Sequence, residues 1–186
     1  MKSLCVFCGS SSGIRPEYGV VARELGTLLA RRGTELVYGG GRVGLMGALA
    51  DAALAAGGRV VGVIPQMLLD KEVGHTGLSE LHVVATMSQR KVLMGELAEA
   101  FIALPGGIGT MDELFEAWTW TQLALHRKPC GLLNFQGYYD PLVAFLDRST
   151  QEGFLRPRHR AELLVDDDLP RLLDRLTDLA GHDPGG

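Results

Sequence analysis

The sequence predicts an α/β protein built on a doubly wound parallel β-sheet with helices on both faces. Short, continuous apolar runs alternate along the chain with amphipathic segments of helical periodicity, which is typical of strands that are buried on both sides. Glycine clusters directly follow several of the apolar runs, and each indicates a tight turn from a strand into a helix. Since crossovers between parallel strands are right-handed, the simplest arrangement is a Rossmann-like fold.

The first half of the chain contains two strand–loop–helix units and a third strand. The apolar runs end at a glycine cluster or at a proline, and the helical stretches carry their apolar residues on one side. The segment from Gln66 to Thr86 has weak periodicity, and we expect a long connection over the sheet edge. The predicted strands are 4–8, 36–38 and 60–64, and the predicted helices run over about 16–31 and from Leu45 to the stop at Gly57-Gly58.

The second half repeats the alternation, with an apolar run at 100–104 and a helix that starts near Thr110. A run at 129–133 predicts a fifth strand. No linker of altered composition interrupts the chain, so we expect one domain over residues 1–180 and a flexible tail over 181–186. The remaining predicted elements are helices at about 88–98, 138–152 and 169–179 and a short extended piece at 163–165.

Composition excludes several classes of protein. The 186 residues are 46% hydrophobic and 22% charged, which is too apolar for a disordered chain. A net charge of -4 without a basic stripe argues against nucleic acid as a partner, and no apolar segment approaches the length that spans a membrane. The odd number of cysteines, all in or beside apolar runs, predicts reduced thiols and a cytoplasmic location.

The strongest local signal is the segment 104–113, Leu-Pro-Gly-Gly-Ile-Gly-Thr-Met-Asp-Glu. Its glycines allow successive N–H groups to converge on one point, Thr110 adds a hydroxyl, and the following helix adds the positive end of its dipole. No Gly-Lys-Ser/Thr follows and the dinucleotide fingerprint is absent, which disfavours ATP hydrolysis and NAD chemistry. The segment therefore predicts a loop that binds a phosphate.

Glu113 is the candidate catalytic residue of this segment. Its carboxylate is expected one helical turn from the phosphate loop, near the ribose of a bound nucleotide. The alternative is structural, because the spacing of Thr110 and Glu113 also fits a capping box in which each side chain accepts from a free N–H at the helix start.

A second signal is the pair Arg90-Lys91 in the first turns of a predicted helix. Cations there oppose the helix dipole, so an anionic ligand would explain their position. Arg90 is the stronger candidate, because a guanidinium group binds phosphate or ribose oxygens with two hydrogen bonds. The alternative is a pair of solvated side chains that pair with Glu96 or Glu99, and it weighs most for Lys91.

Other common catalytic arrangements are missing from the sequence. The five histidines are isolated from one another and from the cysteines, so no metal site is predicted, and no Gly-x-Ser-x-Gly elbow is present. Cys8 adjoins the first glycine loop without an accompanying base, and we expect a small buried thiol there rather than a nucleophile.

Taken together, these segments resemble the LOG (LONELY GUY) family of cytokinin riboside 5'-monophosphate phosphoribohydrolases. The resemblance extends from about Lys2 to Gly153, with Ile108 and the leucine-rich stretch 66–71 as departures. It rests on the segments 105–113 and 87–91, on Cys-Gly-Ser-Ser at 8–11, on Tyr-Gly-Gly-Gly at 38–41, and on 131–134 and Gly-Tyr-Tyr at 137–139. The label lysine decarboxylase, which such proteins have often carried, has no support here, since nothing resembles a pyridoxal phosphate site.

The resemblance implies a Rossmann-like homodimer that hydrolyses N6-substituted adenosine 5'-monophosphates, and in many members AMP, to the free base and ribose 5-phosphate without a cofactor. It implies Arg90 and Glu113 as the catalytic pair. The implied substrate contacts are Glu72, Arg90, Lys91, Gly107, Ile108, Gly109, Thr110, Met111, Asp112, Glu113 and Thr119.

Two other functions compete with this one. An AMP nucleosidase of nucleotide salvage would use the same chemistry, and a non-catalytic carrier of a nucleotide or of the molybdenum cofactor would share the fold. The presence of both Arg90 and Glu113 favours the enzyme over the carrier. For the dimer, we expect contact through the helices that follow Ser88 and Thr110.

Overall fold

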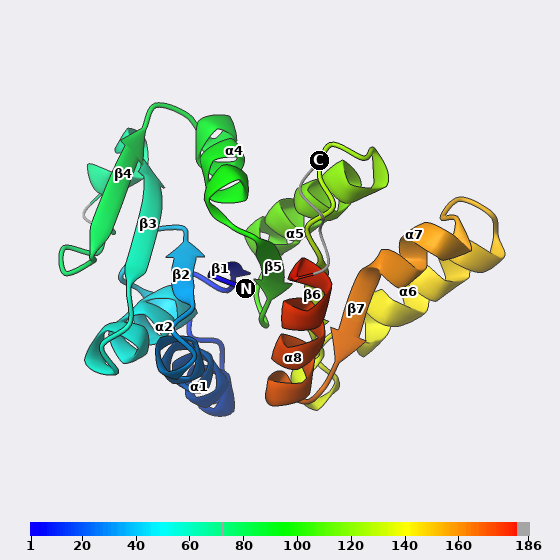
Figure 1. Ribbon diagram of the computed structural model, residues 1–186, viewed down its shortest axis with the longest axis horizontal. Coiled ribbons are helices and arrows are strands. Elements are labelled where there is room, and N and C mark those ends of the chain that lie inside the picture. Colours follow the sequence, from blue (N-terminus) through cyan, green and yellow to red (C-terminus); the bar gives the residue numbers. More distant parts are fainter. Residues whose placement is uncertain (72, 182–186) are drawn as a thin grey trace.

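The computed structural model describes residues 1–71 and 73–181, and Figure 1 shows their arrangement. Seven parallel strands form one sheet in the order β4-β3-β2-β1-β5-β6-β7, so the chain first winds outward from β1 to β4 and then returns to β5 and winds the other way. This is the doubly wound, Rossmann-like sheet that the sequence predicts. The strands are β1 Ser3–Phe7, β2 Glu35–Tyr38, β3 Val60–Pro65, β4 Glu80–Val84, β5 Ala100–Ala103, β6 Cys130–Leu133 and β7 Leu163–Asp166.

Helices cover both faces of the sheet (Figure 1). Apolar side chains of α1, α2 and α8 form one core layer, and those of α4, α5 and α6 form the other. None of the described helices is long and apolar enough to cross a membrane. The helices are α1 Glu17–Arg31, α2 Gly44–Ala55, α3 Gln66–Leu69, α4 Met87–Leu97, α5 Ile108–Gln122, the 3-10 turn η1 Phe135–Gly137, α6 Asp140–Gln151, α7 Pro157–Glu162 and α8 Leu169–Ala180.

The central strand β1 explains why the sequence contains continuous apolar runs. Leu4 and Val6 are buried in the layer beneath α1 and α2, whereas Cys5 and Phe7 are buried in the layer beneath α4 and α5. Successive side chains of a strand point to opposite faces, so a strand covered on both faces must be apolar at every position.

The expectation of a long connection over 66–86 is wrong. This segment contains the short helix α3 and the edge strand β4, which pairs in parallel with β3 from Val61 with Glu80 to Pro65 with Val84. The strand was missed because an edge strand is only half covered, and β4 accordingly carries the polar residues Glu80 and His82. The run near 130 is therefore the sixth strand of the chain, not the fifth.

Most of the other predicted elements agree with the structure to within a few residues. The extended piece at 163–165 is a true strand, because β7 pairs with β6 from Cys130 with Leu163 to Leu133 with Asp166. Helix α5 begins at Ile108, two residues before the predicted start. The predicted tail over 181–186 lies outside the described residues, apart from Gly181.

The order of the strands places a crevice between the carboxyl ends of β1 and β5. These two strands are neighbours, but β1 leads to α1 on one face of the sheet and β5 leads to α5 on the other. In doubly wound sheets, the point at which successive connections diverge to opposite faces is where ligands bind.

Candidate active site

Three glycine loops meet at the carboxyl ends of the strands. The loop after β1 lies between two others, the loop after β5 and the loop before α2. Backbone hydrogen bonds connect it to both. Gly9 donates its N–H to the carbonyl oxygen of Pro105 at 3.2 Å, and Leu45 donates its N–H to the carbonyl oxygen of Gly9 at 3.0 Å. The backbone itself therefore fixes the relative positions of the three loops.

A cleft with a volume of about 570 Å³ opens beside these loops. This volume lies in the range of small-molecule and cofactor sites. The residues that line it come from the ends of β1, β2, β3 and β5 and from four helices or the loops before them: Cys8, Ser10, Gly39, Gly41, Val43, Met46, Ile64, Leu68, Val73, Met87, Arg90, Gly107, Ile108, Gly109, Thr110, Asp112 and Glu113.

The start of α5 is open toward the cleft. Gly107 is the N-cap of α5 and no side chain caps the helix, so its first N–H groups have no side-chain acceptor. A Cβ atom added to Gly107 or Gly109 would meet no heavy atom within 4 Å, which leaves this backbone accessible. A Cβ atom at Gly106 would instead lie 2.1 Å from Oγ1 of the buried Thr110, so the loop needs glycine at that position.

The capping box that competed with a catalytic role for Glu113 is not formed. A capping box places its hydroxyl residue at the N-cap, but the N-cap of α5 is Gly107 and Thr110 is the third residue of the helix. Glu113 is the sixth residue, one turn into α5, and it lines the cleft.

Arg90 and Glu113 form an ion pair in the lining of the cleft. The side chain of Arg90 is 8% exposed and that of Glu113 is 10% exposed, and Nη2 of Arg90 lies 3.4 Å from Oε1 of Glu113. The α4 N-cap Thr86, whose Oγ1 accepts from the Gln89 N–H at 3.1 Å, fixes the turn that presents Arg90. Within the described part of the chain, the buried Nε of Arg90 has no hydrogen-bond partner.

Burial controls the protonation of the groups in the cleft. Burial raises the pKa of the Glu113 carboxyl above its ordinary value, and the positive charge of Arg90 opposes the increase. Burial also strongly raises the pKa of the Cys8 thiol, with a smaller contribution from Glu113. Cys8 is therefore a neutral buried thiol, as the sequence predicts, rather than a nucleophile.

Lys91 lies next to Arg90 in the sequence but faces α5. Its Nζ forms ion pairs with Asp112 and Glu116, each at 3.1 Å, and so connects α4 to α5. The alternative of a pairing with Glu96 or Glu99 is wrong for Lys91, because its ammonium group pairs with two carboxylates of α5.

The structure brings most of the predicted site residues together. Arg90, Asp112 and Glu113 line the cleft with residues 107–110, whereas Lys91 does not. Met111 packs into the core layer on the far side of α5, and Thr119 is exposed farther along the same helix. Glu72 lies outside the described residues.

One side of the cleft is an apolar wall that was not predicted from the sequence. The wall consists of Val43, Met46, Ile64, Leu68 and Val73. Ile64 was detectable, because it occupies the carboxyl end of a predicted strand at the edge where ligands bind. The other four gave no signal, since single apolar residues in a helix or loop look like ordinary core residues.

Comparison with known proteins identifies the family. A family model described as "Possible lysine decarboxylase" matches residues 46–176. A cytokinin riboside 5'-monophosphate phosphoribohydrolase of Rhodococcoides fascians is 53% identical over 169 residues, which cover 90% of this chain and 85% of the relative. The Arabidopsis thaliana enzyme of the same name, LOG7, is 52% identical over 159 residues, which cover 86% of this chain and 73% of that protein.

Solved structures with the same fold include the molybdenum cofactor carrier protein of Chlamydomonas reinhardtii. It has a TM-score of 0.73 and 23% sequence identity, and the match covers 96% of this chain and 98% of the carrier. At this identity the likeness shows the fold alone. The identities of about one half over most of the chain, with the match to the family model, show that this chain belongs to the LOG family of cytokinin riboside 5'-monophosphate phosphoribohydrolases.

Proposed function

We propose that this chain hydrolyses the N-glycosidic bond of N6-substituted adenosine 5'-monophosphates and releases the free base and ribose 5-phosphate. The observation that carries the proposal is the buried pair of Arg90 and Glu113, which faces a cleft beside the uncapped start of α5. The relatives that are identical to this chain at about one half of the aligned positions are named for the same reaction, which supports the proposal.

The start of α5 suits the 5'-phosphate. Free N–H groups at a helix N-terminus and the positive end of the helix dipole together bind phosphate oxygens. With the phosphate beside 107–110, the ribose lies close to Glu113, which is one turn farther along α5.

Glu113 would act on the ribose carbon. As the bond between C1' and the base nitrogen breaks, positive charge develops on the ribose, and a carboxylate stabilises it or orients the water that attacks C1'. The water supplies the hydroxyl group that C1' carries in ribose 5-phosphate. The proton that the water loses balances the proton that the departing base nitrogen takes up. The partly buried Glu113 carboxylate is protected from solvent that would screen this charge.

Arg90 has two available roles in this reaction. Its guanidinium group would hold the ribose phosphate, or it would donate to the departing base and so stabilise the negative charge that develops there. The position of Arg90 in the lining of the cleft supports either role.

The apolar wall favours an N6-substituted base over AMP. A hydrocarbon substituent on N6 would be removed from water against Met46, Leu68 and Val73, whereas the bare amino group of AMP gains nothing from an apolar surface. Each methylene group of the substituent that becomes buried contributes roughly 0.8 kcal/mol to binding.

Turnover of two nucleotides tests the proposed function. The purified protein would be incubated with isopentenyladenosine monophosphate and separately with AMP, both with a chelator, and release of free base followed by chromatography. Faster release from the N6-substituted nucleotide is the expected result. A preference for AMP would assign the protein to nucleotide salvage, and no release from either would overturn the enzymatic proposal.

We further propose that residues 1–180 act as one catalytic domain and form a homodimer through α4 and α5. Val92 on α4 and Leu123 just beyond α5 are apolar, yet 45% and 60% exposed. Light scattering at micromolar concentration should give a dimer, and Val92→Glu should weaken it. Val20→Glu, at a similarly exposed position on α1, is the matched control, and a monomeric parent protein would exclude the dimer.

The free, buried thiols of Cys5, Cys8 and Cys130 support the proposal of a cytoplasmic location, where thiols stay reduced. Fractionation of cells that express the tagged protein tests this, and recovery of the protein outside the cytoplasm would contradict it.

A further inference from the structure

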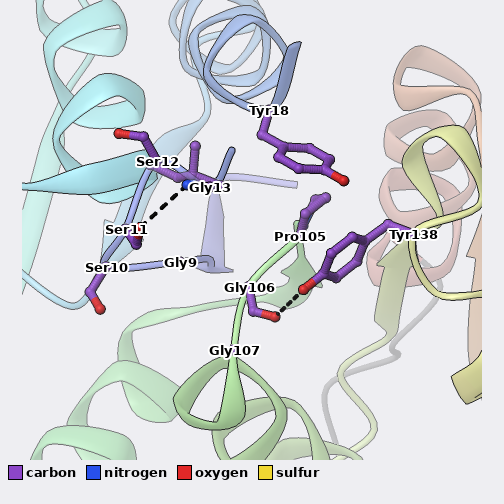
Figure 2. Close-up of a pocket in the computed structure, with 11 residues that line it drawn as sticks. Gly9, Ser10, Ser11, Ser12, Gly13, Tyr18, Pro105, Gly106, Gly107 and Tyr138 are labelled. Carbon is purple, nitrogen blue, oxygen red and sulfur yellow. Dashed lines mark hydrogen bonds between the residues drawn. The ribbon is translucent and has the colours of Figure 1, made fainter. Parts of the chain in front are cut away.

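Two adjacent tyrosines hold the loop between β5 and α5 from outside the cleft. The hydroxyl of Tyr139 donates to the carbonyl oxygen of Leu104 at 2.7 Å, and the hydroxyl of Tyr138 donates to that of Gly106 at 2.8 Å. Figure 2 shows the second of these hydrogen bonds. Both tyrosines belong to the Gly-Tyr-Tyr segment that the proposed reaction does not use.

A compact turn after β6 presents the two tyrosines to the loop. Asn134 accepts the backbone N–H of Tyr139 at its Oδ1 at 2.7 Å and donates from Nδ2 to Asp140 at 2.7 Å. Gln136 and Gly137 both have positive φ angles, of 52° and 73°, which reverse the chain between Asn134 and the tyrosines. The backbone at Tyr138 is therefore held in a defined turn.

Three successive carbonyl groups of the glycine loop are occupied. Leu104 and Gly106 accept from the two tyrosines, and Pro105, between them, accepts the N–H of Gly9. By contrast, the N–H group of Gly107 donates to no acceptor within residues 1–71 and 73–181. The loop thus has these three acceptors satisfied and the Gly107 N–H free, which is the arrangement that an anion requires.

The hydrogen bond of Tyr138 fixes one particular peptide group. In a trans peptide the carbonyl of Gly106 and the N–H of Gly107 point in opposite directions. Tyr138 holds the carbonyl on the side of a second cavity, of about 270 Å³, which it lines with Gly106, whereas Gly107 borders both that cavity and the cleft with Arg90 and Glu113. Holding the carbonyl on one side keeps the Gly107 N–H on the other.

We propose that Tyr138 is a positioning residue that keeps the Gly107 N–H directed at the 5'-phosphate of the substrate. This inference rests on the proposed function for the identity of the ligand. Without the tyrosine hydroxyl, the glycine peptide is free to rotate, because neither Gly106 nor Gly107 carries a side chain that would restrict it. Rotation would present a carbonyl oxygen to the phosphate and repel it.

Tyr138 is suited to this test because its ring is held independently of its hydroxyl. It packs edge-on against Tyr18, with ring centroids 5.5 Å apart, and against Tyr139, with centroids 4.7 Å apart. It is also 40% exposed, whereas Tyr139 is 4% exposed and belongs to the core. Removing the hydroxyl of Tyr138 should therefore leave the fold and the ring position intact.

The test compares Tyr138→Phe with Tyr18→Phe. The control removes a hydroxyl from the same second cavity without touching the loop carbonyls. We expect Tyr138→Phe to raise KM for the nucleotide by about threefold to tenfold, with kcat within about twofold, as the loss of one hydrogen bond predicts. By calorimetry, Kd for AMP and for ribose 5-phosphate should increase by a similar factor, and that for the unphosphorylated isopentenyladenosine should not.

Two results would overturn the proposal. The first is unchanged binding of AMP and ribose 5-phosphate by Tyr138→Phe. The second is an equal loss of binding for the unphosphorylated nucleoside, which would indicate general distortion of the cleft. Calorimetry needs no turnover, so a protein that binds AMP but releases no base would contradict the proposed reaction and still allow the role of Tyr138 to be decided.

Discussion

Gly39 and Arg90 are so close that a Cβ atom added to the glycine would lie 1.7 Å from Nη2 of the arginine. Gly39 immediately follows β2, in the second of the glycine loops, and both residues line the cleft. The absence of a side chain at Gly39 is what allows the guanidinium group to lie buried against the strand end and to reach Glu113.

Gly39→Ala should therefore displace Arg90 without removing it. Because the clashing atom belongs to the group that faces the substrate, we expect kcat/KM to fall by at least about tenfold, with a smaller effect on the thermal midpoint. Steady-state kinetics and thermal unfolding of the same preparation measure both quantities. Gly19→Ala on α1, where the added Cβ meets only the flexible end of Arg23 at 3.3 Å, is the control. Full activity of Gly39→Ala would show that the position of Arg90 is unimportant.

Glu113→Gln should reduce kcat by at least about 100-fold and change KM by less than about tenfold. The amide keeps the shape of the side chain but cannot stabilise positive charge on the ribose. Release of base under saturating nucleotide gives kcat. Glu116→Gln, one turn later on α5 with its carboxylate paired to Lys91, is the matched control and should stay close to the parent. Equal turnover of Glu113→Gln and the parent would leave Glu113 with no catalytic role.

The pH dependence of kcat should reflect the buried carboxylate of Glu113. Its raised pKa means that a larger fraction is protonated at any given pH, so kcat falls as pH decreases through a value above the ordinary 4.5. A profile from about pH 4 to about pH 9 measures this acid limb. The limb should be absent from Glu113→Gln, and a parent limb at or below the ordinary carboxyl pKa would contradict the prediction.

The raised pKa of Glu113 also makes stability depend on pH, but in the opposite direction to kcat. The folded protein binds the Glu113 proton more tightly than the unfolded chain does. The contribution of Glu113 to the free energy of unfolding therefore decreases as pH rises from the ordinary pKa through the raised pKa. Unfolding of the parent and of Glu113→Gln across this interval isolates that contribution.

Asp166→Asn should lower the free energy of unfolding by about 1–3 kcal/mol at neutral pH. The buried carboxylate at the end of β7 accepts from Nε of Arg171 at 2.9 Å and from Nη1 of Arg175 at 3.1 Å. The loss is moderate because both arginines are partly exposed and regain water when the carboxylate is removed. Asp167→Asn, at an exposed ion pair with Arg171, is the control and should have almost no effect.

The side chain of Arg171 holds the pKa of Asp166 well below its ordinary value. The contribution of the Asp166 carboxylate to the free energy of unfolding is complete above the pKa of the unfolded state. It is lost as pH falls toward the pKa of the folded state. Urea unfolding at decreasing pH should therefore show the difference between the parent and Asp166→Asn shrinking on the acid side. A constant difference would contradict the role of the ionised carboxylate.

The sequence predicted the parts of the fold that are covered on both faces. Strand β1 from Leu4 onward and all of β5 are apolar, and a glycine or proline follows each strand closely, so the pattern is complete within a few residues. The edge strand β4 lacks this pattern, because its sheet neighbour β3 lies on one side only. Its pairing depends on tertiary contacts that no local window of sequence contains.

The site was predictable where its residues are close together in the sequence. The loop 104–113 and Arg90 carry signals of type and spacing, and the structure brings Arg90 and Glu113 to within 3.4 Å. The apolar wall comes from residues far apart in the chain, and its members differ from core residues only in their position at the sheet edge. Lys91 is a residue type that often contacts anionic ligands, but here it pairs with Asp112 and Glu116. The sequence could not reveal these pairs, because the partners are more than twenty positions away.

The apolar wall and the reacting groups of the cleft come from different segments of the chain. The apolar wall belongs to the first half, with Val43, Ile64 and Val73, whereas Arg90 and Glu113 belong to α4 and α5. Substitutions in the apolar wall would change which base is accepted and leave the reacting groups in place. A lineage could therefore exchange one nucleotide for another without rebuilding its chemistry, and an engineer could use the same division.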